Sequence, residues 1–312
     1  MTVRIIHRLI AVLAVFGLLA GCGPRDLPVA AVPSVHPVAG PQAAPRRITY
    51  LLPGALSTSR IFGPLRAAAG PDHLVMEYRF PGLQDQPVDP PMRIARVAQE
   101  IADHAARHPG AELEILAFST GGAIALEAAG RIGPGRKLRV VILSGATPVP
   151  GAYDSALRGS LALAAAVLAT GSLEARTVWG EYYKTLLYGY GWRRDPAIRR
   201  KAEAQAARDR KNLILPVKGL GRAHTRDLLG WRLSPAARTS GAAILFLHGG
   251  RDPVFPVAGV AALARETGAT LCVLPGGGHL LMTTHPRILG RAGDFLAGRW
   301  QGEECRAAPE GN

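Results

Sequence analysis

Short apolar runs alternate with longer amphipathic stretches along most of the chain. Runs at residues 48–52, 73–80, 112–117, 138–143, 243–248 and 270–273 are compact and apolar, which is typical of buried strands. Longer stretches at 92–108, 120–129 and 285–297 place apolar residues at helical spacing or are rich in helix formers. Strands and helices that alternate in this way favour an α/β fold, with a mostly parallel central sheet flanked by helices.

Residues 151–238 interrupt this alternation, because their pattern is helical and strand-poor. The segment carries 16 Lys and Arg against 7 Asp and Glu, and it holds three of the four Trp and five of the seven Tyr. We interpret it as a helical cap inserted between two parts of one core, residues 47–150 and 239–300, with 301–312 as a C-terminal tail. Insertions of this kind commonly shape a substrate pocket.

The N-terminus has the pattern of an export signal. Arg4 and Arg8 precede an apolar run over residues 9–20, which is shorter than the roughly 20 residues that a bilayer span requires. Leu19-Ala20-Gly21-Cys22 resembles a bacterial lipobox, in which the cysteine receives a lipid. We therefore expect residues 1–21 to be a lipoprotein signal peptide and Cys22 to anchor the exported protein to a membrane. An ordinary cleaved secretory signal is the alternative.

Two features refine this prediction of a lipid anchor. Gly23 stands where Asp would retain a lipoprotein in the inner membrane, so in a Gram-negative cell we expect the outer membrane, facing the periplasm. Residues 22–46 contain six prolines, which disfavour a helix and favour extended backbone. We predict that this segment is a tether between the lipid and the core.

The first chemical motif lies where the strand at 112–117 meets the following helix. The sequence there is Ala117-Phe118-Ser119-Thr120-Gly121, and it resembles the G-x-S-x-G nucleophile elbow of the α/β-hydrolase family, with Ala117 at the first glycine. The resemblance implies that Ser119 is a nucleophile above a helix N-terminus, where the helix dipole favours negative charge. Taken alone, the motif also fits a strand-to-helix turn capped by a serine.

Two later segments supply the partners that a nucleophilic serine needs, a base and an acid that orients it. Residues 249–256 resemble the family's G-x-x-D-x-x-x-P loop, and a glycine-rich loop after the last predicted strand ends in His279. In this family the chain order is Ser, acid, His. The resemblance therefore implies a triad of Ser119, Asp252 and His279. Asp154, in the loop after the strand at 138–143, is the alternative acid.

Residues 51–58 resemble the family's H-G-x loop, with Pro53 where His is common. By this resemblance, the backbone N–H of Ala55, or alternatively of Leu56, joins the N–H of Thr120 as an oxyanion hole. We interpret two other histidines near the predicted site as structural residues. His248 stands at a strand end beside the acid loop, where we expect a structural or loop histidine and not the base; His285 we interpret as a cap or surface residue.

Composition narrows the function classes. The net charge is +14 with a pI near 10.5, but the export signal and the absence of any known nucleic-acid motif disfavour nucleic-acid binding. The basic cap therefore suggests a solvated helix face, steering of anionic substrates, or contact with anionic lipid headgroups. No Cys, His and carboxylate cluster in the sequence has metal-ligand spacing, and we expect neither metal nor cofactor. Three cysteines allow at most one disulfide, and Cys272 with Cys305 is the pair we consider.

The resemblance to the α/β-hydrolase family covers about residues 48–296, except the cap. It implies a serine hydrolase that cleaves a small-molecule carboxylic ester or acyl substrate through an acyl-enzyme. A peptidase or a thioesterase on the same triad is the alternative enzyme. A surface lipoprotein that binds without catalysis is the alternative from a different class, because fold alone does not decide function.

Overall fold

The structure is a computed structural model that describes residues 33–41, 44–300 and 302. The predicted signal peptide, the lipidation site Cys22 and nearly all of the tail lie outside the described residues.

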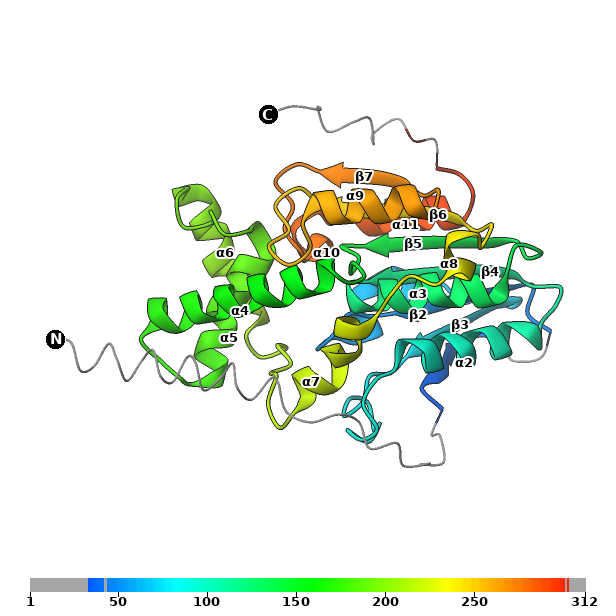
Figure 1. Cartoon of the computed structure of the whole chain (residues 1–312), viewed down its shortest axis with the longest axis horizontal. Helices are drawn as coiled ribbons and strands as arrows, with labels where there is room; N and C mark the ends of the chain where they lie inside the picture. Colours follow the sequence, from blue (N-terminus) through cyan, green and yellow to red (C-terminus); the bar gives the residue numbers. More distant parts are fainter. Residues whose placement is uncertain (1–32, 42–43, 301, 303–312) are drawn as a thin grey trace. The chain divides into compact units, whose positions relative to one another are not determined.

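Seven strands form one sheet at the centre of the described chain (Figure 1). Their order is β1-β3-β2-β4-β5-β6-β7; β1 pairs antiparallel with β3, and all other neighbours are parallel. The predicted mostly parallel sheet is therefore confirmed, with its strand boundaries correct to within two residues. The strands are β1 (Val35–Ala39), β2 (Arg47–Leu52), β3 (His73–Tyr78), β4 (Glu112–Phe118), β5 (Leu138–Leu143), β6 (Ala243–Gly249) and β7 (Thr270–Leu274).

The first strand corrects the predicted tether. Residues 35–39 pair with β3 instead of continuing as a free linker, so the prediction of a tether through residue 46 is wrong for this part. Pro37 is compatible with the strand because β1 lies at the sheet edge, and the register shifts between Pro37 and Ala39. Glu100 holds the start of the strand, because its carboxylate accepts from the N–H groups of Ser34 and Val35 at 2.7 and 2.8 Å.

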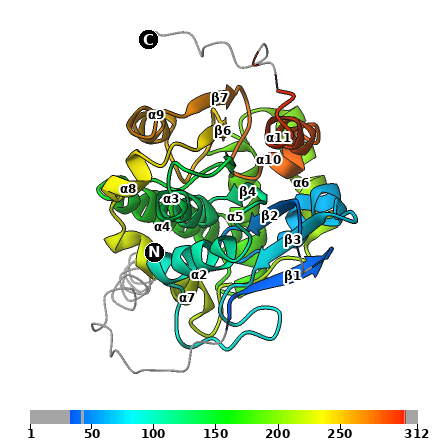
Figure 2. The same cartoon turned by 90° about the vertical axis from the view of Figure 1, so that its right-hand side faces the viewer.

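Helices cover both faces of the sheet, as Figure 2 shows. Alternate residues of each strand point to opposite faces, so that Ile115 of β4 joins one apolar cluster and Leu116 joins the other. On one face lie α2 (Ile94–Ala106), α3 (Thr120–Ile132), α8 (Pro235–Arg238) and α9 (Val257–Glu266); on the other lie η1 (Ser59–Ala67), α10 (Leu281–Thr284) and α11 (Ile288–Leu296). The helix predicted at 285–297 corresponds to α11, which begins three residues later, at Ile288; α10 precedes it and was not predicted.

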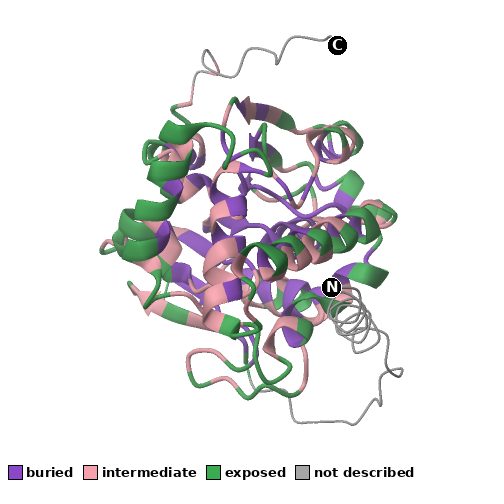
Figure 3. Cartoon of the chain, turned by 90° about the vertical axis from the view of Figure 1, so that its left-hand side faces the viewer, coloured by how far each residue is buried: buried purple, intermediate pink, exposed green. Residues whose placement is uncertain are grey.

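The inserted segment 151–238 is fully described, and its regular secondary structure is entirely helical. They are α4 (Gly151–Thr170), α5 (Ala175–Tyr188), α6 (Pro196–Asp209), α7 (Leu220–Thr225), η2 (Arg226–Gly230) and α8. Figure 3 views the end formed by α4, α5 and α6, where exposed residues lie on the outside and buried strands behind. Among the described residues no single helix has the length and hydropathy of a membrane span; α4 and α5 reach that measure only as a pair bent by 119°.

Candidate active site

Ser119 stands on a strained turn between β4 and α3. Its φ is 53° and its ψ is −119°, in a region that non-glycine residues rarely adopt. Such strain persists only where the surrounding structure holds it, and it is concentrated at functional sites. The turn is held by Ser119 N–H, which donates to Leu143 O at 2.9 Å, and by Ala146 N–H, which donates to Ser119 O at 3.1 Å.

Glycines make this turn possible by allowing close backbone approach. A Cβ at Gly121 would lie 2.2 Å from Leu52 O, and one at Gly54 would lie 2.9 Å from the Ser119 Cβ. Both distances are shorter than side-chain atoms tolerate, so the small residues of the motif serve packing between the elbow and the loop after β2.

We expect Gly121→Ala to destabilise the fold by about 3 kcal/mol or more, because the new methyl group meets backbone atoms that cannot move aside. Gly180→Ala is the matched control, since Gly180 lies within α5 and has no heavy atom within 4 Å of a built Cβ. That control should be neutral or slightly stabilising, by up to about 1 kcal/mol. Urea unfolding of the two variants measures the difference. Equal stabilities would contradict the packing argument.

The three predicted triad residues come together although they lie far apart in sequence. His279 Nε2 is 3.0 Å from Ser119 Oγ, and His279 Nδ1 is 2.8 Å from Asp252 Oδ2. A carboxylate only accepts hydrogen bonds, so Nδ1 carries the proton towards Asp252 and Nε2 is free to accept from the serine hydroxyl. Ser119 and His279 are 7% and 6% exposed, so both residues are largely shielded from solvent.

Asp252 lies in the loop after β6, and its side chain is fully buried. Its Oδ1 accepts from the N–H groups of Val254 and Phe255 at 2.8 and 3.0 Å, which leaves Oδ2 for His279. Burial by itself raises the pKa of Asp252, but the neighbouring His279 and the N–H of Phe255 outweigh burial and hold that pKa below its ordinary value. The carboxylate therefore stays ionised and can orient an imidazole.

The cap contributes to the position of His279. The N–H of His279 donates to Leu186 O at 2.7 Å, and Leu280 N–H donates to the same oxygen at 3.3 Å. Leu186 lies in the last turn of α5, where carbonyl groups lack helical partners. A Cβ at Gly278 would also lie 2.4 Å from Leu187 O. The histidine loop and the end of α5 are therefore packed backbone to backbone.

The other sequence candidates lie elsewhere or have structural partners. Asp154 is exposed in the first turn of α4 and pairs with Arg158, so the alternative acid is not brought to His279. His248 is buried and its Nε2 donates to Phe255 O at 2.8 Å, while burial holds its pKa low. His285 ends α10, where its Nδ1 lies 3.0 Å from Thr284 Oγ1.

Of the two cysteines considered as a disulfide pair, Cys272 is buried and disulfide-bonded, and Cys305 lies outside the described residues.

The two candidates for the first oxyanion donor are distinguished by a hydrogen bond. Leu56 N–H donates to Nδ1 of His224 at 3.0 Å, so this N–H is not available to an oxyanion. Ala55 remains as the candidate beside Thr120. His224 was not among the residues predicted for the site, and no local motif indicates it, because its partner Leu56 lies 168 residues away.

A sequence model of the alpha/beta hydrolase family matches residues 50–292. The chain belongs to this family. No curated protein matches its sequence. The matched region includes the elbow, the acid loop and the histidine loop, so this alpha/beta hydrolase has the three segments in the order that the resemblance implied.

Solved structures agree on the fold of this hydrolase. A carboxylesterase from the thaumarchaeon Nitrososphaera gargenis is 16% identical with a TM-score of 0.60, covering 85% of this chain and 92% of its own. An esterase from Thermogutta terrifontis is 17% identical with a TM-score of 0.57, covering 83% and 92%. MenH from S. aureus is 16% identical with a TM-score of 0.57, covering 82% and 95%. At these identities the likeness establishes the fold alone.

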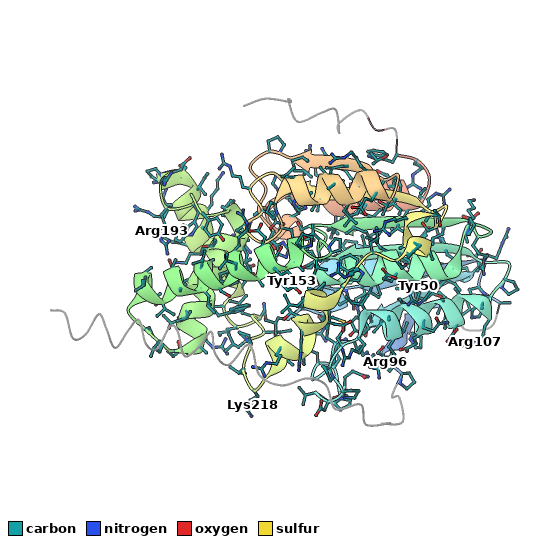
Figure 4. All side chains as sticks on the ribbon, in the orientation of Figure 1. Tyr50, Arg96, Arg107, Tyr153, Arg193 and Lys218 are labelled. Atoms are coloured by element: carbon teal, nitrogen blue, oxygen red, sulfur yellow. The ribbon has the colours of Figure 1, made fainter. Side chains whose placement is uncertain are left out.

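Some of the basic side chains of the hydrolase's cap form ion pairs with acidic side chains of the cap. Glu181 pairs with both Lys184 and Arg193, and these two cations lie 4.9 and 4.6 Å from the ring centroid of Trp192. Figure 4 places the labelled Arg193 and Lys218 on the cap.

A cavity of about 310 Å³ lies between the cap and the core. It is lined by Arg158, Tyr188, Gly189, Tyr190, Gly191, Arg251 and Asp252. Cationic and aromatic residues therefore lie beside the loop that carries Asp252.

Proposed function

We propose that this hydrolase cleaves carboxylic esters through an acyl-enzyme on Ser119. The observation that carries the proposal is the continuous hydrogen-bonded chain from Ser119 Oγ through His279 to Asp252, at 3.0 and 2.8 Å. An activated serine nucleophile needs a base within hydrogen-bond reach and an acid that fixes the base's tautomer. The strained backbone of Ser119 supports the same conclusion.

The proposed reaction has two halves. Ser119 Oγ attacks the ester carbonyl while His279 Nε2 takes the hydroxyl proton, and Asp252 stabilises the imidazolium that forms. The N–H groups of Ala55 and Thr120 stabilise the negative oxygen of the tetrahedral intermediate. His279 then gives its proton to the departing alcohol, which leaves the acyl group on Ser119. A water molecule, activated by His279, releases the acid and restores the serine.

Small-molecule esters are the substrate class that we favour. The carboxylesterase of Nitrososphaera gargenis and the esterase of Thermogutta terrifontis share the fold, which supports this choice by analogy. The same triad could serve a thioesterase or a peptidase, and a binding protein would need no triad at all.

A panel of p-nitrophenyl esters of increasing acyl length, an acyl thioester and a peptide p-nitroanilide tests the substrate class. We expect ester hydrolysis with a dependence on chain length, and labelling of the protein by a fluorophosphonate probe. Faster turnover of the thioester or the anilide, measured as kcat/KM, would replace the ester proposal. A folded protein that neither turns over nor labels would favour the binding lipoprotein.

We also propose that Cys22 carries a lipid and that the enzyme works at the surface of a bacterial membrane. The proposal is supported by the sequence around Cys22 and by the preceding apolar run. Metabolic labelling with palmitate tests it in cells, with Cys22→Ser as the unlabelled control. Equal labelling of both proteins would contradict lipidation at this position.

A further inference from the structure

A histidine of the cap holds the loop that contains the candidate oxyanion donor. His224 lies in α7, which Figures 1 and 2 place beside α2. Its Nδ1 lies 3.0 Å from Leu56 N, and its Nε2 lies 2.7 Å from Pro81 O. Leu56 directly follows Ala55, and Pro81 follows β3 by three residues. One imidazole therefore bridges the loop after β2 and the loop after β3.

The two partners determine the protonation state of this imidazole. An amide N–H can only donate, so Nδ1 must accept; a carbonyl oxygen can only accept, so Nε2 must carry the hydrogen. His224 is 0% exposed, and its ring lies 4.5 Å from the ring of Phe80. Burial lowers the pKa of His224, which is consistent with a neutral ring.

The loop that His224 holds has strained backbone at Leu56, the residue that donates to His224. Ser57 N–H donates to Gly54 O at 3.2 Å, which closes a turn with Ala55 and Leu56 at its centre. Leu56 has a φ of 57°, a conformation that is unfavourable for a branched side chain by about 1–2 kcal/mol. Rotation of the Ala55–Leu56 peptide would relieve this strain, but it would also turn Leu56 N–H away from His224. The hydrogen bond to His224 therefore opposes this rotation and stabilises the turn. In that turn the bond from Ser57 N–H to Gly54 O orients the Gly54–Ala55 peptide, and with it the Ala55 N–H.

The residues on either side of His224 in the chain are bonded to the segment that begins α2. Ala223 O accepts from Met92 N–H at 2.9 Å, and Asp227 Oδ2 accepts from Ile94 N–H at 2.8 Å. Asp227 also pairs with Arg93 at 3.1 Å. The segment that carries His224 is thus bonded to the start of α2, so the imidazole is a rigid support.

We propose that His224 is a positioning residue that keeps the Ala55 N–H directed at the oxyanion through its bond to Leu56. The inference rests on the proposed function, and it assigns the cap a part in transition-state stabilisation. His224 does not touch the reacting atoms; it acts through the Leu56 peptide.

Two conservative variants separate the two hydrogen bonds. In His224→Asn, the amide oxygen can take the place of Nδ1 and accept from Leu56, while the bond to Pro81 is lost. In His224→Gln, the amide nitrogen can reach the place of Nε2 and donate to Pro81, while Leu56 loses its acceptor. Each variant loses one bond of two, so a merely structural role predicts similar losses of kcat and of thermal stability in both.

We expect the two variants to differ in catalysis. In His224→Asn, kcat for ester hydrolysis should stay within about threefold of wild type; in His224→Gln it should fall about 30-fold with KM little changed, less than the roughly 10²–10³-fold effect of deleting an oxyanion donor. Amide exchange at Leu56, measured by mass spectrometry on the full chain, should be slow in wild type and His224→Asn and at least about tenfold faster in His224→Gln, because the hydrogen bond that protects the amide is lost.

The outcomes separate this inference from the proposed function. If wild type is active and His224→Gln keeps its kcat, or if the two variants lose kcat equally, the positioning role is overturned while the esterase remains. Unchanged exchange at Leu56 in His224→Gln overturns it by a measurement that needs no activity. If wild type neither turns over nor labels, the proposed function fails and this role fails with it.

Discussion

Ser119→Ala is expected to lower kcat for ester hydrolysis by about 10⁶-fold and to abolish labelling by a fluorophosphonate. The physical reason is that the hydroxyl 3.0 Å from His279 Nε2 is the group that forms the covalent intermediate. Loss of the nucleophile in a serine hydrolase typically costs an effect of this size, because the remaining donors cannot replace a covalent route. Kinetics on the best ester of the panel, together with gel-based labelling, measures both effects.

Ser144→Ala is the matched control for this variant. Ser144 is buried, directly follows β5 as Ser119 follows β4, and has a positive φ of 46°. Its side chain has no hydrogen-bond partner in the described chain. We expect kcat within about threefold of wild type and full labelling, as for substitutions away from functional groups. Labelling that survives Ser119→Ala and disappears in Ser144→Ala would show that the wrong serine was assigned.

Asp252→Asn should lower kcat by about 10⁴-fold while leaving the fold intact. Oδ1 of Asp252 accepts from Val254 and Phe255, so the oxygen of the new amide takes that place and its NH₂ group faces His279. Nδ1 must then accept, and the proton moves to Nε2, which points to Ser119. The imidazole can no longer accept the serine proton. The ratio of kcat values at pH 8, with circular dichroism to verify folding, measures the effect.

Asp154→Asn serves as the comparison, because Asp154 is the acid that the sequence left as an alternative. It is exposed and paired with Arg158 on α4, so we expect a kcat near that of wild type. If Asp154→Asn lost as much activity as Asp252→Asn, the assignment of the acid would be wrong. Retention of more than a tenth of the activity in Asp252→Asn would contradict the tautomer argument.

Ser119, Asp252 and His279 could be predicted because their motifs resemble those of the family and each motif follows a predicted strand. Parallel strands end at the same edge of a sheet, so residues in the loops after β4, β6 and β7 approach one another whatever their separation in sequence. The motif residues also report on local backbone geometry. The small residues around Ser119 are needed for the strained turn, and the structure has that turn.

The first strand could not be predicted from its own residues. Val35–Ala39 contains Pro37 and lies among other prolines, a composition that favours a linker. The strand forms because β3 offers a free edge and because Glu100, on α2, binds the N–H groups of Ser34 and Val35. Both partners are distant in sequence, so neither contributes to the local pattern.

The sequence by itself determined the α/β alternation and the helical character of residues 151–238, since these depend on local periodicity. Its resemblance to the family also indicated Ser119 and His279, with Asp252 or Asp154 as the acid. Only the tertiary structure decided that residues 35–39 join the sheet, that Asp252 rather than Asp154 meets His279, and that His224 binds Leu56 and leaves Ala55 as the candidate donor. The physical reason is that a hydrogen bond between segments 168 residues apart depends on how the cap packs against the core, and local periodicity contains no information about that packing.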